Sequence, residues 1–166
     1  MKTVRNLCFA LTLCLLLLGG CALLAACGGG SNGLQMLCAD VGLNTGSAKT
    51  LSDDDSHGGF HGDGVRLAVL HFDETADSTL LDTVEGWSPL PLSDELDDML
   101  YKQIEGIYPS DVRIPRVEHG YWYFRDRYSA QSPDAEKPFT ERYSYNFTAA
   151  VLDTDTNTLY YCEVDT

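Results

Sequence analysis

The chain has 166 residues, a length that favours one compact domain, and a formal net charge of −14. So acidic a chain is unsuited to binding nucleic acid or anionic lipid through bulk electrostatics, and no nucleic-acid partner is expected. The cysteines include no Cys-x-x-Cys pair, which excludes a zinc ribbon.

Residues 1–26 have the pattern of an export signal. Lys2 and Arg5 supply positive charge ahead of an almost unbroken apolar run, residues 7–18. That run is shorter than the roughly 20 residues that a membrane span needs. If the run is extended to Ala26 it becomes long enough, so an uncleaved membrane helix is the alternative to a cleaved signal peptide. Both interpretations predict a protein of the cell membrane whose remaining chain lies outside the cytoplasm.

The stretch Leu24-Ala25-Ala26-Cys27 resembles the lipobox of bacterial lipoproteins. The resemblance implies that Cys27 is lipidated and becomes the mature N-terminus. Leu18-Gly19-Gly20-Cys21 is a poorer match, which makes Cys21 the second choice. Each buried CH₂ of an acyl chain contributes about 0.8 kcal/mol, so two or three chains would hold the protein firmly on a membrane. Removal of Lys2 and Arg5 with no acidic residue would change the net charge from −14 to −16.

Residues 27–56 are predicted to be a flexible tether, because they are poor in aromatic residues and rich in Gly, Ser, Asn and Asp. Residues 57–166 are then the folded domain. Beyond the signal and the lipid site, Cys38 and Cys162 are the cysteines that remain. A disulfide between them is one interpretation, since the location is extracytoplasmic. A small, buried apolar role for Cys162 is the other.

Residues 57–64 read His-Gly-Gly-Phe-His-Gly-Asp-Gly. Imidazole and carboxylate ligands suit Zn²⁺ or a similar divalent ion, so His57, His61 and Asp63 are a candidate metal site. The glycines would let the backbone turn tightly around an ion or approach a ligand closely. A loop that contacts a ligand and a plain connector into the next strand are the alternatives. No other cofactor is expected.

Residues 65–72 are predicted to form a central strand, because both of its faces are largely apolar. Residues 93–105 are predicted to form a helix, capped by Ser93 and ended by Gly106 in the left-handed conformation. The apolar residues of this helix recur at helical spacing and form one stripe: Leu96, Met99, Leu100 and Ile104.

The C-terminal part alternates between strand patterns and turn-forming residues. Residues 121–124 are predicted to be a strand, and residues 143–153 and 159–164 a hairpin whose loop is residues 154–158. The order of elements predicts an α+β domain. Its antiparallel sheet of about four strands would be covered on one side by a single helix.

Aromatic residues gather between positions 121 and 145, with arginines among them. If the helix leaves one sheet face uncovered, these side chains would form a contact surface for a protein or glycan of the cell surface. The predicted surface consists of Tyr121, Tyr123, Arg125 and Arg127. The alternative is that the rings fill the core under the helix.

Three stretches together resemble a group of small, uncharacterised proteins from Gram-positive gut bacteria, some of them lipoproteins. They are residues 57–64, residues 120–127 (Gly-Tyr-Trp-Tyr-Phe-Arg-Asp-Arg), and residues 143–148 (Tyr-Ser-Tyr-Asn-Phe-Thr) with 153–161. The resemblance covers most of the predicted domain and implies no activity and no catalytic residue.

The residues therefore favour a lipid-anchored, extracytoplasmic protein that binds a partner or assists other proteins at the cell surface. A metal-dependent or hydrolytic enzyme using His57, His61 and Asp63 is the alternative. A purely structural envelope component is a third interpretation.

Overall fold

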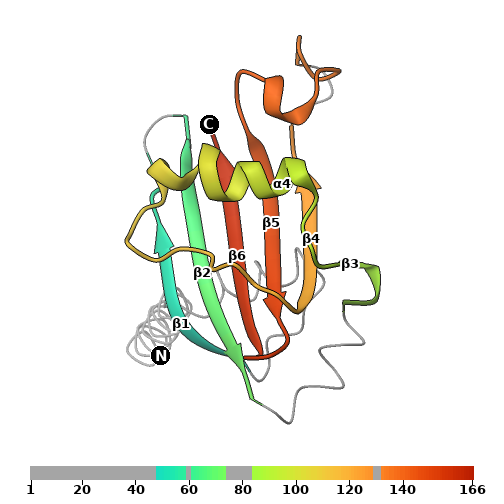
Figure 1. Cartoon of the computed structure of the whole chain (residues 1–166). Coiled ribbons are helices and arrows are strands. Elements are labelled where there is room, and N and C mark those ends of the chain that lie inside the picture. Colours follow the sequence, from blue (N-terminus) through green and yellow to red (C-terminus); the bar gives the residue numbers. More distant parts are fainter. Residues whose placement is uncertain (1–47, 59–60, 74–83, 129–131) are drawn as a thin grey trace, which may run out of the picture. The chain divides into compact units, whose positions relative to one another are not determined.

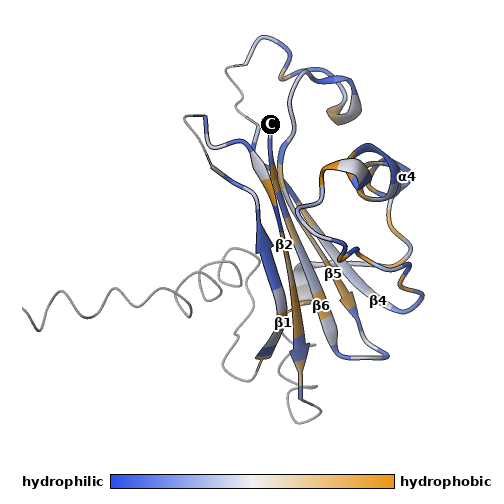
Figure 2. Cartoon of the chain, turned by 90° about the vertical axis from the view of Figure 1, so that its left-hand side faces the viewer, coloured by the Kyte–Doolittle hydropathy of each residue, from blue (hydrophilic) through white to orange (hydrophobic). Residues whose placement is uncertain are grey.

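The computed structural model describes residues 48–58, 61–73, 84–128 and 132–166. All of them fall within one compact unit. Its centre is an antiparallel sheet in which the described strands follow the order β1-β2-β6-β5-β4-β3 (Figure 1). A single helical layer crosses one face of this sheet, as the side view in Figure 2 shows. The predicted combination of an antiparallel sheet with one covering helix is confirmed.

The described sheet has six strands, not the predicted four or so. Their bounds are β1 (Ala48–Asp55), β2 (Gly64–Phe72), β3 (Ser88–Pro89), β4 (Gly120–Asp126), β5 (Asn146–Asp153) and β6 (Thr158–Asp165). The four predicted strands correspond to β2, β4, β5 and β6. The two that the sequence pattern missed, β1 and β3, are the edge strands.

The predicted tether is wrong from residue 48 onward, because β1 lies there. β1 pairs with β2 along its length, from Ala48 opposite Phe72 to Asp55 opposite Arg66. Its polar composition suggested a linker, but an edge strand is held by main-chain hydrogen bonds and need not bury an apolar face. Three aspartates and a register shift between Thr50 and Ser52 also discourage this edge from pairing with another chain.

The strand β2 is central, as predicted, and lies between β1 and β6. Val65 and Leu67 face the helix and are at most 2% exposed. Ala68 and Leu70, the two neighbours of Val69 in the chain, are fully buried as well. The even-numbered residues of β2 point to the sheet face that lies opposite the helix. This face is called the second face below.

The helical layer consists of α4 (Asp94–Asp98), a π-helical continuation η3 (Met99–Gln103) and the 3₁₀ turn η4 (Glu105–Ile107). The predicted cap is confirmed, because the Leu96 N–H donates to Ser93 Oγ at 3.3 Å. No helix within the described ranges is long and apolar enough to cross a membrane.

The predicted apolar stripe packs on the sheet, and each of its members is at most 4% exposed: Leu96, Met99, Leu100 and Ile104. The predicted left-handed end at Gly106 is wrong. This glycine has no positive φ and lies inside the 3₁₀ turn η4, after which Tyr108 is extended. The helix ends by tightening its last turn into a 3₁₀ turn, and this ending needs no capping glycine.

The hairpin between β5 and β6 is confirmed. Asp153 Oδ1 accepts the Asp155 N–H at 2.8 Å and the Thr156 N–H at 3.2 Å, which closes the turn. Asn157 takes the positive φ, 49°, that asparagine tolerates best after glycine. Residues 1–47, which hold the predicted signal, Cys21, Cys27 and Cys38, lie outside the described residues.

Candidate functional site

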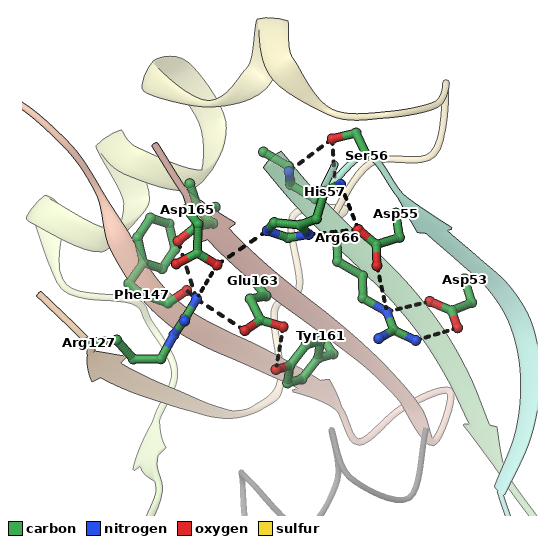
Figure 3. Close-up of polar contacts among 12 residues, drawn as sticks. Asp53, Asp55, Ser56, His57, Arg66, Arg127, Phe147, Tyr161, Glu163 and Asp165 are labelled. Carbon is green, nitrogen blue, oxygen red and sulfur yellow. Dashed lines mark hydrogen bonds and ion pairs between the residues drawn. The ribbon is translucent and has the colours of Figure 1, made fainter. Parts of the chain in front are cut away.

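Charged side chains gather on the second face, at the end of the sheet where β1 and β6 finish (Figure 3). Cross-strand pairing brings them together, since Asp55 lies opposite Arg66 and Arg66 lies opposite Glu163. Directly opposite residues in antiparallel strands project to the same face. The group is called the polar cluster below and consists of Asp53, Asp55, His57, Arg66, Arg127, Glu163 and Asp165.

His57 lies between two carboxylates. Its Nδ1 is 2.6 Å from Asp55 Oδ1, which also accepts the His57 backbone N–H at 2.8 Å. Its Nε2 is 3.2 Å from Asp165 Oδ2, close enough for an ion pair although not aligned as a hydrogen bond. The ring is 20% exposed. Both ring nitrogens therefore face carboxylates of this chain rather than open solvent.

Burial alone would raise the pKa of Asp55. The hydrogen bonds from the His57 backbone and ring, with the charges of His57 and Arg66, outweigh that effect and hold the pKa of Asp55 below its ordinary value. The carboxylate consequently stays ionised beside His57. A group whose pKa is lowered by folding stabilises the fold above its unfolded pKa and loses that contribution as the pH falls.

Arg127 ties the end of β4 to β5 and β6. Its Nη2 lies 3.0 Å from Asp165 Oδ2 and 3.2 Å from Glu163 Oε1. The same nitrogen is within donating distance of the Phe147 and Val164 carbonyl oxygens, at 3.2 and 3.3 Å. Burial lowers the pKa of this guanidinium, but the Asp165 and Glu163 carboxylates raise it further, so the net direction is upward.

Arg66 also ties neighbouring strands together, at the other side of the polar cluster. Its Nε and Nη2 donate to the two oxygens of Asp53 at 2.8 and 2.7 Å, a two-bond geometry that fixes both side chains. Asp55 Oδ2 lies 4.0 Å from the same Nε. Because Asp53 and Asp55 belong to β1, these contacts fasten the edge strand to β2.

Carboxylates alternate with His57 and the two arginines across the polar cluster. The side chains are only about one-fifth to two-fifths exposed, so the attraction is less screened than at an open surface. While Asp55 and Asp165 face its two ring nitrogens, His57 offers neither nitrogen to a substrate. The geometry suits a structural clamp between strands better than acid–base catalysis.

The described residues do not bring His57, His61 and Asp63 together as a set of metal ligands. No group of three or more histidine, cysteine, aspartate or glutamate side chains in the described ranges is placed to hold an ion. His61 and Asp63 are exposed, whereas His57 belongs to the polar cluster. Residues 59–60, between the two histidines, lie outside the described residues.

The predicted contact surface occupies one face of β4. Tyr121, Tyr123 and Arg125 alternate along the strand and point to the second face, and Arg127 follows directly after the strand. All four are half-buried. Trp87 packs beside Tyr123 with ring centroids 5.6 Å apart. Arg127 belongs to the polar cluster, and the row of Tyr121, Tyr123 and Arg125 makes up the rest of the predicted surface.

The other aromatic residues of β4 fill the core under the helix. Phe124 packs against Phe139 and Phe147, with ring centroids 5.1 and 5.7 Å apart. Trp122 lies on the same side and packs against the core. Alternation along the pleated strand therefore divides its aromatic residues between the second face and the core under the helix.

Cys162 is a fully buried free thiol, which confirms the predicted apolar role. Burial raises the pKa of this thiol to about 12, so it stays protonated and unreactive. Its predicted disulfide partner, Cys38, lies outside the described residues.

The sequence pattern missed the pairing of Arg127 with Glu163 and Asp165. A signal was present, because Arg66, Glu163 and Asp165 are charged residues inside or at the end of strands that are otherwise apolar. Which of them meet depends on strand order, and the strand order is not visible in a single sequence.

No protein-family model, no curated protein and no solved structure matches this chain. The lipobox resemblance and the resemblance to gut-bacterial proteins therefore stay predictions.

Replacing Arg127 by methionine should lower the free energy of unfolding by about 2 kcal/mol, because Asp165 would lose its guanidinium partner while staying half-buried. Urea denaturation of the fragment 28–166 measures this change. Lys102→Met is the matched control, since Lys102 forms an exposed ion pair with Asp98, and its effect should be too small to resolve. Equal effects of the two substitutions would contradict the clamp.

Proposed function

We propose that this chain is a lipid-anchored extracytoplasmic protein that binds a partner at the cell surface, without catalysis of its own. Two independent features support the proposal. The lipobox pattern at residues 24–27 supports the anchor. The second face of β4 supports the binding role, because it carries a row of tyrosine and arginine at the margin of the sheet.

The observation that carries the binding role is the position of Tyr121, Tyr123 and Arg125. They stand on alternate residues of one strand, point to the same face and are neither buried nor fully exposed. Tyrosine offers a flat apolar surface with a hydroxyl at its tip, and arginine offers a planar set of donors. Such side chains are enriched at protein interfaces and also suit the faces of sugar rings.

The alternative enzyme, a metal-dependent or hydrolytic one using His57, His61 and Asp63, has less support. Its key histidine is faced by Asp55 on one side and by Asp165 on the other. A general base needs one free nitrogen within hydrogen-bonding reach of a substrate. A metal ligand also needs one free nitrogen with its lone pair directed at the ion.

Replacing Cys27 by alanine in the full chain should abolish lipid attachment and membrane anchoring, because no other cysteine follows so complete a lipobox. Expression in a bacterium with a lipoprotein pathway, followed by detergent phase partition and intact mass, measures both. Cys21→Ala is the matched control and should leave the acylated mass unchanged. An acylated Cys27→Ala chain would contradict the assignment, and an unacylated but membrane-bound parent would show the uncleaved helix instead.

Replacing Tyr121 by serine should weaken binding of the fragment 28–166 to the surface of the source cells by about tenfold, because an interface aromatic residue is lost. Flow cytometry of cells incubated with labelled fragment gives the apparent affinity. Tyr143→Ser is the matched control, since Tyr143 is 92% exposed and lies outside the row. No saturable binding, or equal loss in the two variants, would contradict the proposal.

A further inference from the structure

The outer edge of β4 is only partly covered. The short strand β3 pairs with two of its residues, Ser88 opposite Trp122 and Pro89 opposite Tyr121. Before Ser88 the chain turns away, because Trp87 N–H donates to the Val84 carbonyl in a 3₁₀ turn. Within the described ranges, no strand pairs with the outer side of residues 123–126 (Figure 1).

Two hydrogen bonds, one at each end of β4, show to which side each residue of the strand directs its N–H and C=O. Leu90 N–H donates to the Gly120 carbonyl on the outer side at 3.0 Å, and Arg127 N–H donates to the Asn146 carbonyl on the β5 side at 2.7 Å. These directions alternate along a strand. Phe124 therefore directs both its N–H and its C=O to the outer edge, in the register position that β3 leaves vacant.

A pocket opens beside Phe124 on the helix side of the sheet. It has a cavity volume of about 60 Å³ and is lined by Ser93, Glu95, Leu96, Trp122, Phe124 and Phe139. A residue placed directly opposite Phe124 on an added antiparallel strand would project its side chain to this same face. The pocket and the open edge thus form one site, with main-chain bonding at the edge and an apolar cavity next to it.

The charge at the rim of the pocket indicates which kind of residue flanks the apolar residue of an added strand. Glu95 lines the pocket and is exposed, and Asp94 beside it is exposed as well. Within the described part of the chain, neither carboxylate forms an ion pair with a basic side chain. In an extended strand, residues two apart share a face about 7 Å from each other, so a basic residue two positions from the apolar one reaches this rim.

The two edges of the sheet differ in how they are protected. β1 carries Asp53, Asp54 and Asp55 and an internal register shift, devices that discourage pairing with another strand. β4 has no such shift, and its charged residues are the last two, Arg125 and Asp126. An edge without a register shift and with an uncharged residue, Phe124, at its open position can add a further strand.

We propose that the outer edge of β4 binds an extended peptide segment of a partner protein. The segment runs antiparallel to β4, its apolar side chain opposite Phe124 enters the pocket, and a lysine or arginine two residues away meets Glu95. This inference rests on the proposed binding function and names the class of partner, but it uses a surface separate from the row of Tyr121, Tyr123 and Arg125.

A random dodecapeptide display library, selected on the full chain immobilised in mild detergent, tests the proposal. The enriched peptides should share an apolar residue with a lysine or arginine two positions away and no proline between them. Their affinity should fall about tenfold on Glu95→Lys, an effect equal to 1.4 kcal/mol. Glu105→Lys is the matched control, because Glu105 is exposed in η4, away from this pocket, and should change affinity less than about twofold.

N-methylated versions of the best peptide test the main-chain bonding. Methylation of the amide of the apolar residue should abolish binding, because that N–H bonds to the Phe124 carbonyl. Methylation of either neighbouring amide, which points away from β4, should be tolerated. Peptides that are indifferent to both the methylation pattern and Glu95→Lys overturn the edge site, yet leave the binding function standing if Tyr121→Ser weakens them. A library without any enriched peptide overturns the edge site, whereas the cell-binding assay judges the binding function separately.

Discussion

The whole structure depends on three neighbouring strands, β2, β6 and β5, that bury side chains on both faces. In one row across the sheet, Leu67, Cys162 and Ala149 face the helix and are fully buried. In the next row the second face is equally closed, with exposures of at most 1%: Ala68, Tyr161 and Ala150. Burial of this kind excludes charge from the middle of the sheet, because an unpaired buried ion is very costly. Charged side chains are confined to the strand ends and the sheet edges.

The polar cluster lies at one such end of the strands. Removing half-buried ions from water costs free energy that ion pairing only partly returns, so the cluster is weak evidence for high stability. Its stronger effect is on register. A slip of β2 by one residue would turn Arg66 into the apolar core under the helix and separate it from Asp53. The cluster therefore penalises the wrong pairings more than it rewards the right one.

Sequence patterns predicted the elements whose apolar residues follow a period. The central strand, the helix from residue 93 and the C-terminal hairpin were all recognised from hydrophobic spacing, capping and turn residues. β1 was missed because its sequence, Ala-Lys-Thr-Leu-Ser-Asp-Asp-Asp, has no apolar face and its stability comes from pairing with β2. Local patterns do not report pairing between distant segments.

Of the polar cluster, the sequence singled out only His57 and Arg127, each for a different site. His57 was singled out for its chemistry, and the structure places it in an ion network instead of a metal site. The distant partner that decides this is Asp165, which meets His57 because β6 and β1 flank β2. The division of the β4 aromatic residues between two faces followed from alternation and was accessible from the sequence, once the strand was assigned.

The central claim is that residues 48–55 are part of the sheet and are fastened there by the polar cluster. Native-state hydrogen exchange of the fragment 28–166 tests it most directly. The β1 amides bonded to β2 should be protected well above the level of an unfolded chain, while the β2, β6 and β5 amides should exchange only through global unfolding. Exchange of all β1 amides at the rate of a free peptide would contradict it. In that case the folded domain would begin after Asp55, and Arg66 would have no fixed partner in β1.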